Sequence, residues 1–317
     1  MKKIRVGVVG VGYLGQFHAE KYAAHPEVEL VGVVDTDTAR ASQIADKLKT
    51  KSYSTPADLF GQVDAVSIVV PTILHYTIAK QFLDQGIHVL LEKPITTTLE
   101  QADELLYLAE KKGAILQIGH IERFNPAYRA VKSKANIPRY ITAERAAPFT
   151  VRCTDVNVIL DLMIHDLDIV SDLAGSEPKE MSAAGASVIT NQIDAASARI
   201  IFGNGYVADV SASRISDEKK RLLRVYDQES VYTADYQTQK AFLRRKGNPG
   251  SEPLAEDISF EKCDTLNEEI RAFIQSVLTG ASPLVSGYDG RRSLCLALTI
   301  TRIIEQGIFG FVPLDKA

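Results

Sequence analysis

The sequence predicts an α/β protein with two parts: an N-terminal doubly wound parallel sheet, then a C-terminal α/β domain with an open, mostly antiparallel sheet. Three observations predict it. The length of 317 residues corresponds to about two domains at roughly 150 residues each. The first 120 or so residues alternate short apolar runs with helical patterns, whereas strands follow one another directly after about residue 179. We expect the domains to span residues 1–122 and 123–317.

The parallel sheet is predicted from apolar runs that are rich in Val, Ile and Leu and bounded by turn residues. Helical patterns separate these runs, and strands alternating with helices form βαβ units whose sheet is covered on both faces. The expected strands span residues 4–9, 28–34, 64–70, 87–91 and 114–118, and the expected helices span about 13–25, 36–49, 73–86 and 98–112.

The pattern changes in the second half of the chain. Strands without intervening helices predict an antiparallel sheet. Helices are expected near 126–135, 155–174, 265–279 and 289–306, and strands near 139–147, 181–190, 196–202, 206–214, 221–226, 229–236 and 239–245.

Composition excludes several classes of protein. A net charge of −4 argues against a nucleic-acid partner, which favours a basic face. No apolar run approaches the length of about 18 residues that a membrane helix needs. The three cysteines, Cys153, Cys263 and Cys295, lack metal-ligand spacing and predict free thiols. We therefore expect a cytoplasmic protein without a bound metal.

A dinucleotide site is predicted at the end of the first strand. The segment from Gly10 to Gly15 reads G-x-G-x-x-G, which allows a tight turn, close approach of a pyrophosphate and close helix packing. Asp35 ends the second strand, where an acid binds the ribose hydroxyls and repels the 2′-phosphate of NADP. NAD is therefore favoured, and FAD is the main competitor. The predicted contacts here are Gly10, Gly12, Tyr13, Leu14, Gly15, Asp35 and Thr36.

A second cofactor-binding segment is expected further along the same sheet. Glu92, Lys93 and Pro94 follow the strand at 87–91, and ligands bind at the carboxyl ends of parallel strands. Pro71 and Thr72 end the preceding strand and are expected in the same crevice. A lysine elsewhere would normally be a solvated surface group.

Together these motifs resemble the Gfo/Idh/MocA family of nicotinamide-dependent sugar and polyol oxidoreductases. The resemblance covers essentially the whole chain and implies a Rossmann domain, a second domain whose open sheet builds dimers or tetramers, and a catalytic Lys93, Asp161 and His165. It also places His75 and His120 near the cleft. The segments that carry it are Gly10–Gly15, Pro71-Thr72-x-x-His75, Glu92-Lys93-Pro94, Gly119-His120, Arg123-Phe124-Asn125-Pro126 and Asp161-x-x-x-His165.

The helix near 155–174 supports a titratable site without reference to the family. On an α-helix, Asp161, His165, Asp168 and Asp172 fall within an arc of about 60° on an otherwise apolar helix. A solvated face would be wider and richer in Lys and Glu. Two other interpretations stay open: a buried structural histidine held by an aspartate, or an Asp/His metal site that no further cluster completes.

The chemistry implied is oxidation of a secondary alcohol. His165 suits a general base because its unperturbed pKa is about 6.5, and Asp161 would orient it. Lys93 would stabilise the developing alkoxide or instead accept the proton itself. The sequence leaves these two assignments open.

The segment from Gly119 to Pro126 resembles that of family members that oxidise C3 of UDP-N-acetylglucosamine, which makes a sugar nucleotide the expected substrate. Arginines bind phosphate with two parallel hydrogen bonds, although each could equally be a surface residue. The alternatives are a free-sugar or inositol dehydrogenase, and a non-catalytic NAD-sensing regulator. The predicted substrate contacts are His120, Arg123, Asn125, Arg145 and Arg152.

Overall fold

The computed structural model describes residues 3–135, 138–150, 156–248 and 251–314. The chain forms two compact units. Unit 1 comprises Met1–Ile121 and Asp264–Arg291, and unit 2 comprises Glu122–Cys263 and Arg292–Ala317. The first division lies next to the predicted one at residue 122, but the predicted second domain is not continuous. Helix α7 (Thr265–Thr279) belongs to unit 1, because its apolar face, including Ile270 and Phe273, is buried in that unit's core.

Unit 1 contains a six-stranded sheet in which every pairing is parallel. The strand order β3-β2-β1-β4-β5-β6 reverses direction between β1 and β4, and such a switch point is where open α/β sheets bind ligands. The predicted strands are confirmed, and the short polar edge strand β3 is additional. The strands are β1 (Ile4–Val9), β2 (Val28–Val34), β3 (Lys51–Tyr53), β4 (Ala65–Ile68), β5 (His88–Glu92) and β6 (Leu116–Gly119).

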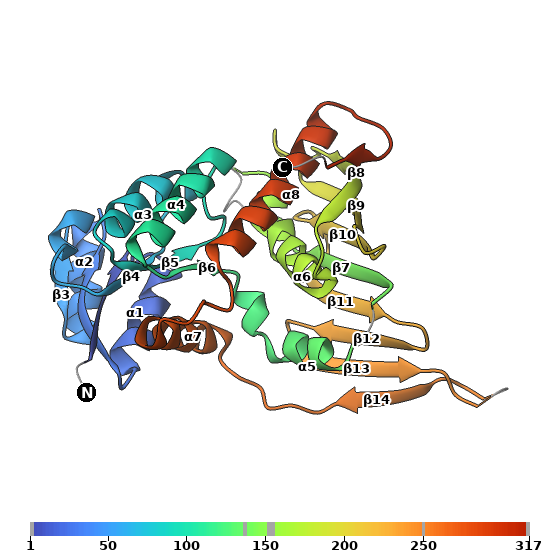
Figure 1. Ribbon diagram of the computed structural model, residues 1–317, viewed down its shortest axis with the longest axis horizontal. Coiled ribbons are helices and arrows are strands. Elements are labelled where there is room, and N and C mark those ends of the chain that lie inside the picture. The colour runs from blue at the N-terminus through green and yellow to red at the C-terminus, as the bar shows by residue number, and fades with distance from the viewer. Residues whose placement is uncertain (1–2, 136–137, 151–155, 249–250, 315–317) are drawn as a thin grey trace. The chain divides into compact units, whose positions relative to one another are not determined.

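Helix α4 (Leu99–Lys112) of unit 1 begins and ends at recognisable caps. The side chain of Thr98 accepts a hydrogen bond from the Gln101 N–H at the start of α4, and Gly113 ends that helix in the left-handed region. Figure 1 shows α1, α3 and α4 beside this sheet. The helices are α1 (Gly15–Ala24), α2 (Thr38–Leu48), α3 (His75–Asp84), α4 (Leu99–Lys112) and α7.

Unit 2 contains a nine-stranded sheet in the order β14-β13-β12-β11-β7-β10-β9-β8-β15. All its pairings are antiparallel except β7 with β10, which is parallel, so the predicted mostly antiparallel sheet is confirmed. The two edge strands β14 and β15 are additional to the prediction. The strands are β7 (Tyr140–Ala146), β8 (Pro178–Ala186), β9 (Ala195–Phe202), β10 (Val207–Ser213), β11 (Lys220–Tyr226), β12 (Ser230–Asp235), β13 (Lys240–Arg245), β14 (Leu254–Ile258) and β15 (Val312–Pro313).

Helices cover one face of this sheet within unit 2. Every second side chain of β9 and β10 is buried, in the same core as α6 (Ile164–Ala174). Helix α6 follows a π-helical turn at Ile159–Met163. Helix α5 (Pro126–Lys134) lies against β12 and β13 (Figure 1). The C-terminal part of α8 (Gly287–Glu305) adds to the same core.

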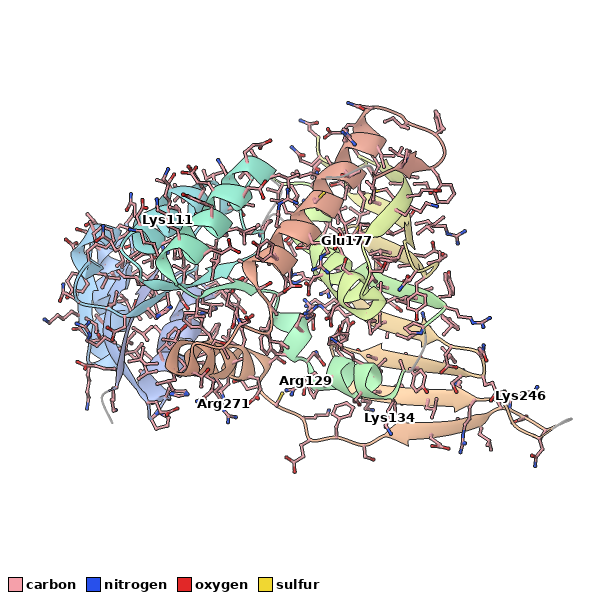
Figure 2. The ribbon with its side chains drawn as sticks, viewed as in Figure 1. Lys111, Arg129, Lys134, Glu177, Lys246 and Arg271 are labelled. Carbon is pink, nitrogen blue, oxygen red and sulfur yellow. The ribbon has the colours of Figure 1, made fainter. Side chains whose placement is uncertain are left out.

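Charged side chains lie on the outer surfaces of both units. Figure 2 labels Lys111 on α4, Arg271 on α7, and Arg129 and Lys134 on α5, all of them exposed. Over the part of the chain that the structure describes, the helices are too short or too polar to cross a membrane.

Candidate active site

The turn after β1 has the geometry of a phosphate-binding loop. Gly10 has a φ of +86°, and a Cβ there would lie 2.3 Å from the Val69 carbonyl oxygen. A Cβ on Gly15 would lie 1.9 Å from the Gly10 carbonyl oxygen. A Cβ on Gly12 would have Arg40 Nη1 as its nearest neighbour, at 3.7 Å, which leaves room for a ligand. Two glycines therefore build the turn, while the third keeps its surface open.

Asp35 is held where the prediction requires an acid. Its carboxylate accepts the Val11 N–H at 3.0 Å and the Asp37 N–H at 2.9 Å. Arg40 lies 3.6 Å from Asp35 and 2.9 Å from Asp37, so it contacts both carboxylates. This group of two carboxylates and one guanidinium carries a net negative charge.

Exposed apolar side chains lie on the loops that leave β1 and β4. Tyr13 is 72% exposed and Ile73 is 77% exposed, and Leu14 and Leu74 are also exposed. Both loops follow the carboxyl ends of adjacent strands. Pro71 and Thr36 are exposed and Thr72 is half-buried. This edge of the sheet therefore offers apolar contact area beside free backbone, which suits a ring system joined to a pyrophosphate.

His75 clamps the segment that carries the predicted catalytic lysine. Its Nδ1 lies 2.7 Å from the Pro94 carbonyl oxygen and its Nε2 lies 2.9 Å from that of Val70. Burial lowers the pKa of His75, so the neutral ring donates to one of these carbonyls at a time. These contacts give His75 a positioning role between the ends of β4 and β5. The Lys93–Pro94 peptide is cis, and Lys93 is half-buried.

The Glu92 carboxylate contacts the start of the segment that carries Lys93. Its Oε2 accepts the backbone N–H of Lys93 at 3.3 Å, and its Oε1 lies 3.3 Å from His18 Nε2. A Cβ on Gly119 would lie 2.8 Å from the Glu92 carboxylate, so only a glycine at the end of β6 leaves room for it. His120, the next residue, is 1% exposed.

The four titratable residues predicted on one face of a helix, Asp161, His165, Asp168 and Asp172, do not all lie on one continuous α-helix, because a π-helical turn precedes α6. Asp161 lies within that turn and His165 in the first turn of α6, and both are half-buried. The wider turn changes the angular spacing from that of a continuous α-helix, and π-helical turns are frequent at functional sites. Asp168 and Asp172 instead contact Arg123, at 3.7 Å and 2.9 Å.

Two arginines predicted to bind phosphate are buried in ion pairs with carboxylates. Arg145 is 3% exposed and bonds Asp166 through Nε and Nη2 at 2.8 Å and 3.1 Å, and Glu122 through Nη1 at 3.2 Å. Arg123 is 6% exposed and pairs with the two aspartates of α6. These contacts place both guanidinium groups in the interior of unit 2, where they balance carboxylates.

Asn125 caps a helix. Its Oδ1 accepts the Ala127 N–H at 3.1 Å, and its Nδ2 donates to Glu122 and to the Tyr236 carbonyl oxygen. Its side chain thus starts α5, in the position that precedes Pro126. Arg152 and Cys153 lie outside the described residues.

Two groupings of functional-type side chains were not predicted from the sequence, although Glu92 itself was predicted as a cofactor contact. One is the partner set of the buried arginines, Glu122 and Asp166. The other joins His18, Glu92 and Glu269, whose candidate ligand atoms all lie within 4.8 Å of one another. His18 is not among the site residues predicted from the sequence; it lies about one helical turn after Gly15 on α1, on the side that faces Ser67 of β4. Nothing in the sequence pairs it with a glutamate on α7.

Comparison with known proteins identifies the same family along the chain. The Gfo/Idh/MocA model described as an oxidoreductase family with an NAD-binding Rossmann fold matches residues 4–120. The model of the family's C-terminal domain matches residues 127–231.

Relatives and solved structures match over nearly the full length. The chain is 38% identical over 312 residues to a UDP-N-acetylglucosamine 3-dehydrogenase of Acidithiobacillus ferrooxidans, covering 96% of this chain and 98% of that protein. It is 28% identical over 329 residues to a scyllo-inositol 2-dehydrogenase (NAD(+)) of Bacillus subtilis, covering 96% and 95%.

The structure of the Acidithiobacillus enzyme superposes with a TM-score of 0.90 at 37% identity, covering 96% of this chain and 99% of that one. A probable dehydrogenase from Thermotoga maritima, with a TM-score of 0.85 and 24% identity over 98% and 99% of the two chains, shares the fold. The chain therefore belongs to the Gfo/Idh/MocA family of oxidoreductases.

Proposed function

We propose that this protein is an NAD-dependent dehydrogenase that oxidises the C3 hydroxyl of UDP-N-acetylglucosamine to the 3-keto sugar nucleotide. The observation that carries the proposal is the identity of 38% over 96% of the chain with an enzyme of that activity. Inositol dehydrogenases match a similar share of the chain at 28% identity or less, so they supply the second candidate function.

The residues of unit 1 fit a dinucleotide. The open surface at Gly12 admits a pyrophosphate next to the start of α1, where helix N–H groups favour negative charge. We assign NAD rather than NADP because Asp35 and Asp37 outnumber Arg40, and the remaining negative charge repels a 2′-phosphate. The pyrophosphate would contact the segment from Gly10 to Gly15, and the ribose would contact Asp35.

The proton-transfer groups come from Lys93 and His165. NAD, when bound, supplies the hydride acceptor. Lys93, at the end of β5, would donate a hydrogen bond to the reacting oxygen and stabilise its developing negative charge. His165 would accept the hydroxyl proton, with Asp161 stabilising the charged imidazole. The reverse assignment, in which Lys93 takes the proton, is distinguished by the variants described in the Discussion.

Substrate recognition is proposed for His120 and Arg152. Arg123 and Arg145 are engaged by buried carboxylates, so the proposal does not require them to bind phosphate. Arg152 remains the arginine proposed for the diphosphate, since guanidinium groups bind phosphate with good geometry. An Arg152→Ala variant should raise the KM for UDP-N-acetylglucosamine and leave the KM for NAD unchanged.

A homodimer or homotetramer is proposed through the sheet of unit 2. Within the described residues, the face opposite α5 and α6 has a shallow hollow of about 580 Å³, lined by Thr142, Ser197, Arg199 and Asp209 among others. Sheets pack on one another face to face, so this face suits a second copy of the chain. Light scattering on the purified protein should give twice or four times the mass of the chain.

The function is tested with a substrate panel. The purified protein is incubated with NAD or NADP and with UDP-N-acetylglucosamine, UDP-glucose, glucose, myo-inositol or scyllo-inositol, and NAD(P)H formation is followed by absorbance. We expect turnover of UDP-N-acetylglucosamine with NAD, and a product with a carbonyl at C3 by NMR. Turnover of inositols alone would establish the second candidate function. Tight NAD binding without turnover of any substrate would indicate a regulator.

A further inference from the structure

A buried cluster of titratable groups lies beneath Lys93, within unit 1. Glu269 of α7 is fully buried, and neither of its carboxylate oxygens has a hydrogen-bond partner among the described residues. His18 of α1 is also fully buried, and Glu92 at the end of β5 is half-buried. One ring nitrogen of His18 and one carboxylate oxygen from each glutamate lie within 4.8 Å of one another.

Each member except Glu269 has partners that hold it in place. His18 Nδ1 lies 3.3 Å from Ser67 Oγ, which lies 2.7 Å from the Tyr22 hydroxyl. Glu92 accepts the Lys93 N–H at 3.3 Å, and Gly119 leaves room for its carboxylate. The main chain of Glu269 is fixed, because its carbonyl oxygen accepts from Gln117 Nε2 at 3.2 Å. The backbone of α7 is therefore held so that the Glu269 carboxyl group faces Glu92.

Ionising both carboxyl groups is unfavourable, because one oxygen of each lies within 4.8 Å of the other and Glu269 is fully buried. A buried carboxylate without a partner is costly enough that it takes up a proton instead, and two neighbouring carboxyl groups share one proton. Glu92 has the Lys93 N–H and the His18 ring beside it, so it is the better anion. Burial, together with the charge of Glu92, raises the pKa of Glu269 well above its ordinary value.

We propose that Glu269 is a neutral carboxylic acid that donates a hydrogen bond to Glu92, and that the cluster of His18, Glu92 and Glu269 positions Lys93. The cluster acts on Lys93 through the backbone, because the Glu92 carboxylate accepts a hydrogen bond from the Lys93 N–H. The catalytic consequence rests on the proposed function, which assigns proton chemistry to Lys93. The protonation of Glu269 does not depend on that assignment.

The titratable groups around Glu269 come from two elements packed against α7. Helix α1 contributes His18 and Tyr22, and β5 contributes Glu92, followed by Lys93. Burial raises the pKa of Tyr22, so it stays neutral across the ordinary pH range. The neighbouring strands contribute Ser67 and Gln117, which do not titrate. Glu269 is therefore the group whose ionisation, as pH rises, adds a second negative charge to the cluster.

Linkage gives this proposal a test that needs no turnover. A group whose folded pKa is raised stabilises the protein fully below its unfolded pKa, about 4.3 for Glu. That stabilisation decreases as pH rises and is lost once pH passes the folded pKa. Glu269→Gln is always neutral, keeps the shape and donates an N–H. The stability of the wild type minus that of Glu269→Gln should therefore fall as pH rises, and Glu268→Gln on the same helix is the matched control.

Three variants separate the neutral acid from its alternatives. At pH 7, Glu269→Gln should keep kcat within about 3-fold of the wild type, because the hydrogen bond to Glu92 is retained. Glu269→Leu has no donor and should lower kcat about 10-fold or more, with a smaller change in the KM for NAD and with the protein still folded. The pH profile of kcat should shift in Glu269→Leu and not in Glu268→Gln.

Several outcomes would overturn the proposal. One is that Glu269→Gln is as damaging as Glu269→Leu, which would mean that the ionised carboxylate is needed. Another is a stability difference that does not vary with pH. A third is a divalent metal that co-purifies at one per chain and is lost with stability on chelation, which would make the three residues metal ligands. If no substrate in the panel is turned over, the proposed function fails, while the stability measurement still decides the state of Glu269.

Discussion

Buried carboxylates are neutralised differently in the two units. In unit 2, Asp166 and Glu122 lie against the guanidinium of Arg145, whereas in unit 1 the carboxyl groups of Glu92 and Glu269 lie within 4.8 Å of each other, beside His18. Arg221 also pairs with Glu122, and a second group of unit 2 joins Arg123 and Lys132 to Asp172. The cations and carboxylates of the two groups balance: Arg123, Lys132, Arg145 and Arg221 face Glu122, Asp166, Asp168 and Asp172.

The difference determines how each unit responds to pH. A guanidinium does not lose its proton at accessible pH, and although burial opposes its charge, Asp166 and Glu122 raise the pKa of Arg145 further. The guanidinium of Arg145 therefore keeps its charge, while burial raises the pKa of its partner Asp166 above the ordinary value. A proton, in contrast, leaves the cluster of unit 1 as pH rises. Unit 1 thus has a carboxyl group whose charge can change beside Lys93 without a cation to hold it, whereas in unit 2 the buried carboxylates lie against a permanently charged guanidinium.

Breaking the buried ion pairs of Arg145 in unit 2 should have the largest effect. Arg145→Met leaves two buried carboxylates without their guanidinium, and removing one partner of a buried ion pair costs about 3–5 kcal/mol in the free energy of unfolding. Urea unfolding at pH 7 measures it. Arg245→Met is the control, because Arg245 pairs with Glu256 at the exposed edge of the same sheet and should change stability little. Equal losses in the two variants would contradict a structural role for Arg145.

The next largest effect is expected from removing a proposed proton-transfer group, Lys93 in unit 1 or His165 in unit 2. Lys93→Met and His165→Asn should each lower kcat about 100-fold or more, the usual scale for acid–base groups. NAD affinity, measured by fluorescence titration, should stay near that of the wild type. The variant that loses the acidic limb of the kcat–pH profile identifies the proton acceptor. Turnover close to wild type in one variant would remove that residue from the mechanism.

Another buried carboxylate, that of Asp194, gives a smaller effect whose dependence on pH is opposite to that of Glu269. Asp194 is fully buried and accepts the N–H groups of Val188, Ile189 and Thr190 at 2.7–2.9 Å. Burial acts to raise the pKa of Asp194, but these bonds outweigh it and hold the pKa well below the ordinary range. Its stabilisation is present above the unfolded pKa of about 3.9 and is lost as pH falls.

Asp194→Asn should therefore reduce stability by about 2 kcal/mol at pH 7, the scale for hydrogen bonds to a charged group. The difference from the wild type should shrink as pH falls below about 4. Thermal unfolding between pH 7 and pH 3 measures it. A difference that grows toward acid would show that Asp194 is protonated in the native state. Together with Glu269→Gln, this variant tests whether the stabilisation from each carboxyl group changes with pH in the direction that its surroundings predict.

Most of the fold was predictable because the strands of both sheets are strongly patterned. Continuous apolar runs predicted the buried strands of unit 1, and alternating burial is evident in β9 and β10. The strands that were missed, β3, β14 and β15, are edge strands that lack such a pattern. The π-helical turn at Ile159–Met163 was missed for another reason: its sequence is ordinary for an α-helix.

Parts of the site were predictable only where backbone geometry demanded a particular residue. The glycine pattern and Asp35 were identified because their roles depend on main-chain approach and on the end of a strand. The predicted contact at Arg145 rested on residue type, and those at Arg123 and Asn125 rested also on the resemblance of the segment from Gly119 to Pro126. Type does not tell whether a guanidinium meets a ligand or a carboxylate of its own chain, and all three are buried against internal partners.

The sequence by itself determined the two sheets, the nucleotide-binding turn, the family and the candidates for proton transfer. Each of these depends on local pattern or on spacing along the chain. Only the tertiary structure decided that α7 belongs to unit 1 and that its Glu269 faces Glu92, a residue far away in the sequence. It also decided which arginines form ion pairs with carboxylates of the same unit. The physical reason is that charge pairing in an interior depends on which elements pack together, and long-range packing leaves no periodic signal in the sequence.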